Sequence, residues 1–278
     1  MAYTLVSFHA HPDDEALLTA GTLARAAAEG HRVVLVSATA GGVGLAASSY
    51  GRHGTLAAHR LAELHRSAEA IGASRVELLG YADSGLDGLA EVPDGETAFA
   101  RADVHEAAGR LAAILREEQA DVLTSYDPTG GYGHPDHVQV HRVGALAAEL
   151  AGTPVVLEAT VDRDLLRRAV RLVGRVYRYP PEFDVAQFDT AYAPREEITH
   201  RVDVRRYADR KRASMAAHAS QASADDGDRT LAALLRLPQP VYRRVLGREW
   251  FVERGRPAGR PMLDDVFASL RTPSSGPP

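Results

Sequence analysis

The sequence contains no cysteine and only one lysine, Lys211, in its 278 residues. Without cysteine there is no disulfide, no thiol nucleophile and no thiolate ligand, so any metal must be bound by histidine nitrogen and carboxylate oxygen. Catalysis by a lysine amine is confined to one position. The sequence also lacks a run of about 20 apolar residues, so no transmembrane helix is expected.

An excess of positive charge is also missing. The formal net charge is -5, which gives no reason to expect nucleic-acid binding or a basic membrane-binding patch. No basic segment precedes the first charged motif, so the N-terminal residues do not resemble a signal peptide, and we expect a cytoplasmic protein. Hydrophobic residues make up 45% and charged residues 25%, as in ordinary globular proteins, and the sequence leaves the formation of a homo-oligomer open.

Patterns typical of strands and helices alternate along the first half of the chain. Short Val- and Leu-rich runs predict strands, and longer segments with apolar residues at helical spacing predict helices. The predicted strands are Thr4–His9, Arg32–Ser37, Val76–Leu79, Val122–Ser125 and Val155–Ala159. The predicted helices are Asp14–Glu29, Leu56–Ile71, Ala98–Glu118 and His137–Leu150. This alternation predicts an α/β fold with a mostly parallel sheet and helices on both faces.

The pattern weakens after residue 160. Helices are expected at 164–176 and 207–218, with a strand at 198–204. We therefore expect a catalytic core in residues 1–160 and a smaller C-terminal α+β portion of the same domain in residues 161–271. The final residues, 272–278, are rich in proline and serine and are expected to form a disordered tail.

Polar or glycine-rich segments follow four of the predicted strands. In a parallel sheet the carboxyl ends of the strands meet at one edge, and ligands bind beyond that edge. These segments are residues 11–15, 39–44, 81–85 and 127–137. Each alone is consistent with an ordinary loop, but their shared position predicts a site at this edge.

The first chemical motif is His11-Pro12-Asp13-Asp14-Glu15. A turn into a helix N-terminus brings His11 and Asp14, three residues apart, to one side, and both are suitable ligands for a divalent ion. An acidic residue at a helix start with an incidental histidine is the alternative interpretation. Taken alone, this motif favours the alternative.

The second motif, Gly131 to His137, reads Gly-Tyr-Gly-His-Pro-Asp-His and repeats the order His, Pro, Asp and a further ligand type. Its glycines allow the backbone to turn sharply and to approach a ligand closely. The alternative is a flexible loop that ends in a helix begun by proline. Two such motifs, each after an apolar strand, favour a site over two unrelated loops.

The residue types predict a catalytic metal centre. His11, Asp14 and His137 supply three ligands and leave one position open, which is typical of catalytic rather than structural sites. Zinc is the expected metal, and Fe²⁺ accepts the same ligands. Asp13 is a candidate general base. His134 is expected to protonate a leaving amine or to stabilise an oxyanion, and Asp136 is expected to orient a histidine.

The segment AHPDDE in Ala10–Glu15, paired with GHPDH in Gly133–His137, resembles the LmbE-like or PIG-L N-deacetylases. That family includes deacetylases of N-acetylglucosaminyl-phosphatidylinositol and the deacetylases and amidases of mycothiol metabolism. The resemblance covers about the first 160 residues and reaches His218–Gln221, which is similar to an H-x-[ST]-Q segment of several members. It implies a Rossmann-like fold with a C-terminal portion over the pocket. It also implies that His11, Asp14 and His137 bind the metal, that Asp13 is the general base, and that His134 is the general acid or electrostatic stabiliser.

The resemblance also implies substrate-binding roles for Arg60, Asp83 and Tyr132. A solvated helix face is the alternative for Arg60, and a turn-forming aspartate is the alternative for Asp83. The chain departs from the family at Gly42, where a glutamate is usual, so a pocket carboxylate is expected to be missing. The segment from residue 44 to residue 54 is expected to form a mobile loop beside the pocket.

We therefore expect a hydrolase that removes an N-acetyl group from an N-acetylglucosamine-type sugar or glycoconjugate. One alternative is an amidase acting on another small amide, such as a thiol-sugar conjugate. Two alternatives from other classes are a two-His-one-carboxylate iron oxygenase and a sugar-binding module without catalysis. His141 is expected to have a supporting or plain helical role. Surface or core positions are expected for His59, His65, His105 and His200, and core positions for Trp250 and Phe251.

Overall fold

The computed structural model describes residues 1–43, 54–175, 185–222, 230–259 and 261–271. The tail 272–278 and the expected mobile loop lie outside the described residues, except for residue 54, where a helix begins.

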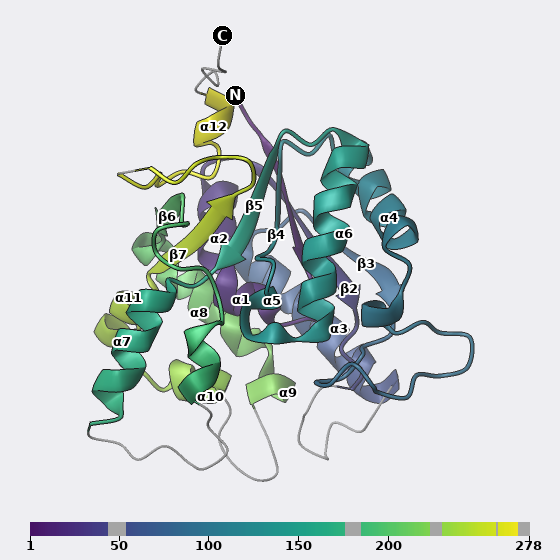
Figure 1. Ribbon diagram of the computed structural model, residues 1–278, viewed down its shortest axis with the longest axis horizontal. Coiled ribbons are helices and arrows are strands. Elements are labelled where there is room, and N and C mark those ends of the chain that lie inside the picture. Colours follow the sequence, from purple (N-terminus) through teal and green to yellow (C-terminus); the bar gives the residue numbers. More distant parts are fainter. Residues whose placement is uncertain (44–53, 176–184, 223–229, 260, 272–278) are drawn as a thin grey trace.

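A seven-stranded sheet forms the centre of the molecule (Figure 1). The strand order is β3-β2-β1-β4-β5-β7-β6, and the first five strands in this order are parallel. Strand β7 is antiparallel to both of its neighbours. The strands are β1 Thr4–His9, β2 Arg32–Thr39, β3 Arg75–Tyr81, β4 Val122–Tyr126, β5 Val155–Thr160, β6 His200–Asp203 and β7 Arg248–Glu253. The predicted mostly parallel sheet is confirmed.

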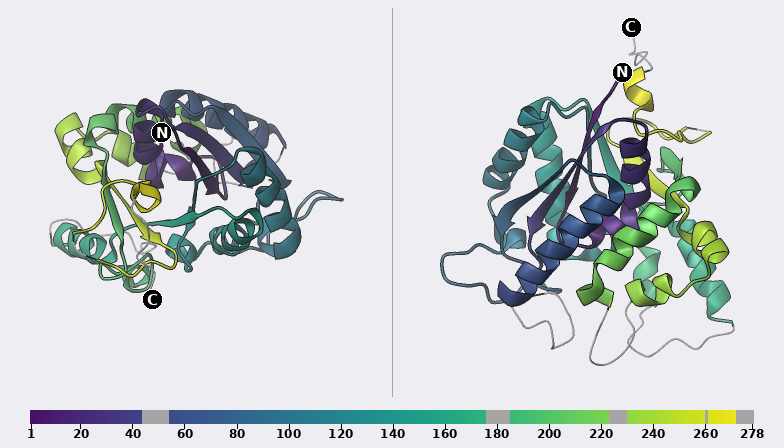
Figure 2. Two further views of the ribbon diagram at one scale, coloured as in Figure 1. Left: turned by 90° about the horizontal axis from the view of Figure 1, so that it is seen from above. Right: turned by 180° about the vertical axis from the view of Figure 1, so that it is seen from behind.

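Helices cover both faces of this sheet (Figure 2). One face carries α1 Asp14–Leu18, α2 Ala20–Ala28, α3 Gly54–Ile71 and α8 Ala208–Ala217, and the other carries α4 Val104–Glu117 and α6 Pro135–Ala151. Shorter or peripheral helices are α5 Gly130–Gly133, α7 Arg163–Val173, α9 Ala219–Ala222, α10 Thr230–Leu235, α11 Gln239–Leu246, α12 Ala268–Arg271, η2 Phe99–Arg101, η3 Val185–Asp189 and η4 Arg205–Tyr207. Within the described ranges, no helix has the length and apolar character to cross a bilayer.

The strands β1, β2, β4 and β5 are largely buried because helices lie on both sides of the sheet. Leu5, Val6 and Phe8 of β1 are inaccessible to solvent. Each such side chain contributes about 1.5–3 kcal/mol by leaving water. The same core cluster includes Phe251 of β7 and the late residue Phe267. Residues from the C-terminal portion therefore share one core with the N-terminal strands, and Phe251 lies in the core as predicted.

A buried ion pair joins the C-terminal portion to the first two helices. Lys211 of α8 and Glu249 of β7 are 1% and 2% exposed, and their charged atoms lie 2.6 Å apart. Lys211 Nζ also donates to the Leu17 carbonyl at 2.8 Å. Glu249 accepts the backbone N–H groups of Gly21 and Thr22 at the start of α2. This pair fixes the junction between α1 and α2.

Two predicted helices differ from the structure. The segment predicted as one helix over Asp14–Glu29 is broken at Thr19, whose φ is -133° and whose hydroxyl donates to the Glu15 carbonyl at 3.3 Å. A side-chain donor on a helical carbonyl competes with the backbone ladder. The segment predicted as one helix over Ala98–Glu118 contains a short 3-10 turn and then α4, which begins after Asp103. The Asp103 carboxylate accepts the Glu106 N–H at 2.9 Å and caps α4.

Candidate metal centre

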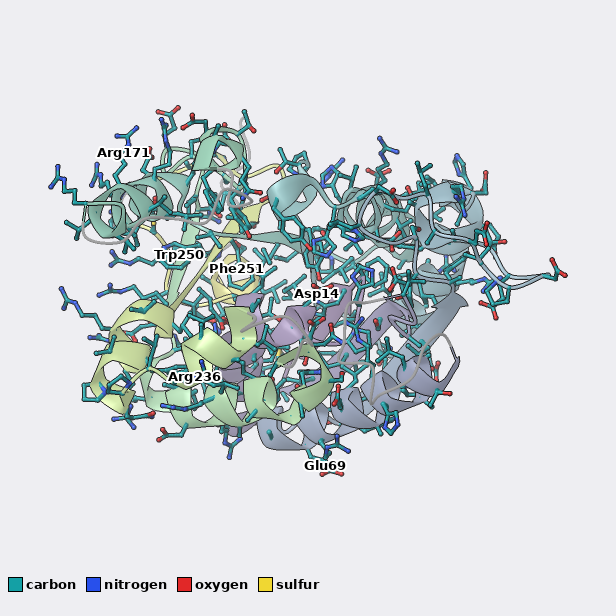
Figure 3. The ribbon with its side chains drawn as sticks, turned by 90° about the horizontal axis from the view of Figure 1, so that it is seen from below. Asp14, Glu69, Arg171, Arg236, Trp250 and Phe251 are labelled. Atoms are coloured by element: carbon teal, nitrogen blue, oxygen red, sulfur yellow. The ribbon has the colours of Figure 1, made fainter. Side chains whose placement is uncertain are left out.

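The two motifs meet at the carboxyl edge of the sheet. His11 follows β1, Asp14 begins α1, and His137 lies in the first turn of α6 after β4. Because β1 and β4 are adjacent parallel strands, the loops after them lie side by side. The His11 N–H donates to Asp14 Oδ2 at 2.9 Å and closes the turn that places both side chains together. Figure 3, seen from this edge, shows Asp14 near the middle of the molecule and Glu69, Arg171 and Arg236 at its periphery.

The spacing of three donor atoms fits a divalent ion. Asp14 Oδ2 lies 3.5 Å from His11 Nδ1, and Asp14 Oδ1 lies 3.4 Å from His137 Nε2. Zinc ligands at about 2.0–2.2 Å in a tetrahedron stand roughly 3.4 Å from one another. His137 Nε2 is buried and has no hydrogen-bond partner in the described part of the chain. Burial of a polar nitrogen without a hydrogen-bond partner costs free energy. The state of His137 Nε2 therefore indicates that this atom binds a cation.

A second cluster, His11, His134 and Asp136, also gathers ligand-type atoms. Its atoms already have protein partners. The Asp136 carboxylate accepts from Ser84 N at 3.0 Å, from Ser84 Oγ at 2.5 Å and from His11 Nε2 at 3.0 Å. His134 Nδ1 accepts the Asp136 N–H at 3.1 Å. The His11–Asp14–His137 cluster is therefore the better cation site, and Asp136 holds the ring of His11.

Negative charge is concentrated around His11. Besides Asp14 and Asp136, Asp83 lies 3.4 Å from His11 Nε2. Burial alone would lower the pKa of His11, but these three carboxylates raise it well above its usual value. Asp83 is held by the N–H groups of Gly85 at 2.9 Å and Val43 at 3.2 Å. A divalent cation bound by His11 would balance the charge of these three carboxylates in place of a proton on the imidazole.

Asp13 is held in an unusual backbone conformation beside this cluster. Its φ is 111°, in a region that costs a residue other than glycine about 1–3 kcal/mol. Arg60 Nη2 donates to Asp13 Oδ1 at 2.9 Å and to the Pro12 carbonyl at 2.5 Å. Arg60 Nη1 donates to the Gly41 carbonyl at 2.9 Å. Burial raises the pKa of Asp13 above its usual value, although the Arg60 charge opposes the change.

His134 and Tyr132 complete the cluster. The His134 ring centroid lies 4.9 Å from that of His11 and 5.0 Å from that of His137. Because His134 Nδ1 accepts a backbone N–H, its neutral form carries the proton on Nε2. Burial and the two neighbouring histidines lower the pKa of His134 to about 4. Tyr132 is 46% exposed, with its ring centroid 5.1 Å from that of His137, so it borders the site on the solvent side.

All nine predicted site residues fall in this one region. Arg60 is 3% exposed and packs against Asp13, so the alternative of a solvated helix face is wrong. Asp83 both forms the predicted turn and faces His11. His141 instead contacts the Tyr126 carbonyl at 3.1 Å and Glu158 at 3.2 Å, in a supporting position. The remaining histidines have surface or core positions as predicted: His59, His65 and His105 are exposed, and His200 is buried.

A polar network lies beneath the site and was not predicted from the sequence. His9 Nδ1 lies 2.9 Å from the Tyr126 hydroxyl, and His9 Nε2 lies 2.7 Å from Ser7 Oγ. The Tyr126 ring centroid lies 4.8 Å from that of His137, so the network reaches a candidate ligand. The available signal was a histidine inside an otherwise apolar strand. Tyr192 was also missed: its N–H donates to the Gly131 carbonyl at 2.9 Å from a distant part of the chain.

Fold and site together define an α/β protein with a candidate divalent-metal centre at the carboxyl edge of its sheet. Residues 6–148 match the family PIG-L, GlcNAc-PI de-N-acetylase. A relative from Geodermatophilus obscurus, named 1D-myo-inositol 2-acetamido-2-deoxy-alpha-D-glucopyranoside deacetylase, is 33% identical over 96% of this chain and 97% of its own. A relative of the same name from Thermobifida fusca is 40% identical over 78% of this chain and 82% of its own. The chain belongs to the PIG-L family, as its two motifs predicted.

Solved structures with the same fold carry more than one activity. An N,N'-diacetylchitobiose deacetylase from Pyrococcus horikoshii covers 99% of this chain and 88% of its own with a TM-score of 0.61 and 21% identity. A 4-carboxy-2-hydroxymuconate hydratase from Pseudomonas putida covers 92% and 98% with a TM-score of 0.54 and 18% identity. These similarities confirm the expected Rossmann-like fold. Because the fold is shared with a hydratase, the reaction must be argued from the site and the closer relatives.

Proposed function

We propose that the protein hydrolyses the N-acetyl group of an N-acetylglucosamine-type sugar, releasing acetate and a free amine. The observation that carries the proposal is a carboxylate, Asp13, beside the three-ligand cluster but outside it. The curated relatives support the same reaction, since they are named as deacetylases of a 2-acetamido sugar linked to inositol. An inositol glycoside of this type is the substrate class that we propose for this chain.

In the proposed site, His11 Nδ1, Asp14 and His137 Nε2 hold the metal, and zinc fits their nitrogen and oxygen donors. A divalent ion there would polarise the amide carbonyl and make a water molecule acidic enough to attack near neutral pH. Asp136 fixes the His11 ring by accepting from Nε2, which leaves Nδ1 directed toward Asp14. Such a carboxylate–histidine contact orients a ligand and raises its basicity.

Asp13 is the proposed general base. It accepts a proton from the attacking water and returns it to the amine nitrogen as the C–N bond breaks, so the proton balance closes within the site. Arg60 fixes one oxygen of this carboxylate. The burial that raises the pKa of Asp13 favours proton acceptance, because a stronger base takes the proton more readily.

His134 is the proposed stabiliser of the oxyanion. Its neutral ring carries a hydrogen on Nε2, and this N–H can donate to the carbonyl oxygen as negative charge develops. The Nδ1 contact with the Asp136 N–H holds the ring in this orientation. His134 therefore acts as a donor throughout the reaction and does not have to begin as a cation.

The substrate is proposed to enter on the side of Tyr132, which is the most exposed of the nine site residues. Asp83 is the proposed acceptor for a sugar hydroxyl. Arg60 is proposed to shape the substrate pocket mainly by holding Asp13 and the Gly41 carbonyl in place. Residues 1–160 form the proposed catalytic core, and residues 161–271 are the proposed C-terminal portion over the pocket.

The test is acetate release from a panel of N-acetylated sugars that includes an inositol-linked N-acetylglucosamine. We expect turnover of the inositol glycoside, loss of turnover after chelation, and recovery with Zn²⁺. Equal rates with and without oxygen would exclude the oxygenase, and any acetate release would exclude a pure binding module. No acetate from any member of the panel by the metal-loaded protein would overturn the proposal.

A further inference from the structure

Glu15 and His218 form a buried pair directly behind the proposed base. Both side chains are inaccessible to solvent, and His218 Nε2 lies 2.5 Å from Glu15 Oε1. The two residues are 203 positions apart in the sequence. His218 ends α8, and Glu15 lies in the first turn of α1, next to Asp14. The C-terminal portion thus reaches the HPDDE motif through this short contact.

The Glu15 carboxylate joins this pair to Asp13. Glu15 Oε2 accepts the Asp13 N–H at 3.0 Å. Glu15 Oε1 accepts from His218 and from the Ser67 hydroxyl of α3, which donates at 2.5 Å. One oxygen therefore holds the backbone of the base, and the other is held by donors from two different helices. Rotation of this carboxylate would break a contact on either side.

We propose that His218 is a positioning residue for Asp13, acting through Glu15, so that the base depends on a residue from the C-terminal portion. This inference rests on the proposed deacetylation, in which Asp13 takes the proton. Asp13 has a φ of 111° and does not hold that conformation without help, because it is sterically unfavourable for an aspartate. Glu15 fixes the N–H of this residue, and Arg60 fixes its carboxylate.

A second contact anchors the segment that carries His218. Ser220 donates to Glu63 of α3 through its backbone N–H at 2.8 Å and through its hydroxyl at 2.6 Å. This contact holds the segment against α3 without involving Glu15. The chain therefore offers a matched control: Ser220→Ala weakens the attachment of the segment, whereas a change at His218 removes the donor to Glu15.

The test compares His218→Leu, His218→Gln and Ser220→Ala for kcat, KM, bound zinc and melting temperature. Loss of a residue that orients a metal-site group costs about 10- to 100-fold in activity, and we expect a fall of this size in kcat for His218→Leu. We expect KM to change by less than about twofold, because substrate contacts are retained. Zinc content is expected to stay at the wild-type value. Glutamine keeps an N–H donor, so His218→Gln should recover most of the lost kcat.

Several results would overturn the inference. They are wild-type kcat in His218→Leu, equal losses in the leucine and glutamine variants, a similar loss in Ser220→Ala, or a loss explained by missing zinc. If His218→Leu does not fold, Ser67→Ala decides, because it removes another donor to the same Glu15 oxygen; an unchanged kcat would count against the inference. Failure of the proposed function has a different signature, since the wild-type protein itself would then release no acetate.

Discussion

Arg60 Nη2 lies 2.9 Å from Asp13 Oδ1, and this contact fixes the one carboxylate of the HPDDE motif that is neither a candidate metal ligand nor fully buried. The arginine side chain is 4% exposed and that of Asp13 is 20% exposed. Arg60 therefore lies in the protein interior, whereas the Asp13 carboxylate is in part accessible to solvent. This arrangement suits a group that must exchange a proton with a substrate molecule.

Replacement of this carboxylate by an amide tests its role. Asp13→Asn should lower kcat by about 100- to 10,000-fold, because an amide cannot accept the proton. Bound zinc should be unchanged, since the three proposed ligands remain. Acetate release and metal analysis on the same sample check both statements. The control is Asp87→Asn, an exposed aspartate on a nearby loop, which should keep wild-type activity. Loss of zinc in Asp13→Asn would make Asp13 a ligand instead.

A methyl group at Gly131 should disturb the loop that carries Tyr132 and His134. A Cβ built there lies 2.9 Å from the Tyr192 ring, and φ is +68°. Either the loop or the Tyr192 ring must shift, and a displacement of reacting groups by about 1 Å can cost 100-fold in rate. We expect kcat of Gly131→Ala to fall by about 10- to 100-fold.

The matched control for Gly131 is Gly152→Ala, which has a similar φ of +72° but no atom within 4 Å of the new Cβ. It should lose about 1–2 kcal/mol of stability from the positive φ and keep its kcat. Kinetics and urea unfolding of both variants make the comparison. Equal kcat in the two alanine variants would show that the contact with Tyr192 has no part in the site.

Loss of the Lys211 charge should be strongly destabilising. Lys211→Met leaves Glu249 buried without its cation, a change that costs about 3–5 kcal/mol. The control is Arg206→Met, an exposed position where the change should stay within about 0.5 kcal/mol. Urea unfolding at neutral pH measures both. A loss below about 1 kcal/mol for Lys211→Met would mean that Glu249 takes up a proton or water at little cost.

Acid should weaken a contact at the amino edge of the sheet. Glu118 accepts from Arg32 and Arg75, which lower its pKa to about 2 from the ordinary 4.5. Because the pKa of Glu118 is lower in the folded state than in the unfolded state, its carboxylate stabilises the folded protein at pH values above 4.5. This stabilisation is lost as the pH falls from 4.5 through about 2. Glu118→Gln should therefore cost about 1–2 kcal/mol at pH 6, and less as the pH approaches 3.

Glu117 provides the comparison for Glu118, because it also contacts Arg75, at 2.9 Å, but is 63% exposed. Glu117→Gln should cost less than about 1 kcal/mol, since solvent screens the pair. Urea unfolding of both variants at pH 6 and pH 3 is the measurement. If the unfolding free energies of Glu118→Gln and wild type differ as much at pH 3 as at pH 6, the assigned pKa of Glu118 is wrong.

Much of the fold and the site could be predicted because the signals are local. The five parallel strands are rich in valine and leucine, since helices cover both faces of the sheet. The proposed ligands lie in two short motifs that follow adjacent strands, so strand order alone brings them together. Strand β7 was not predicted, because Glu249 and Glu253 lie on its buried face with Phe251, so Arg248–Glu253 shows no apolar alternation.

The interactions that could not be predicted are contacts between distant residues. Glu15 is visible in the sequence only as the last residue of the HPDDE motif. Its contact with His218 cannot be read from either local sequence, because the segment around His218 is placed by the packing of α8 against α3. The break at Thr19 is similar, because the hydroxyl contact that accompanies it is not visible in the sequence.

The burial of the only lysine has a practical consequence. Lys211 Nζ is engaged by Glu249 and the Leu17 carbonyl and is shielded from reagents in solution. Amine-directed reagents should therefore leave this lysine unlabelled in the folded protein and react with it only after unfolding.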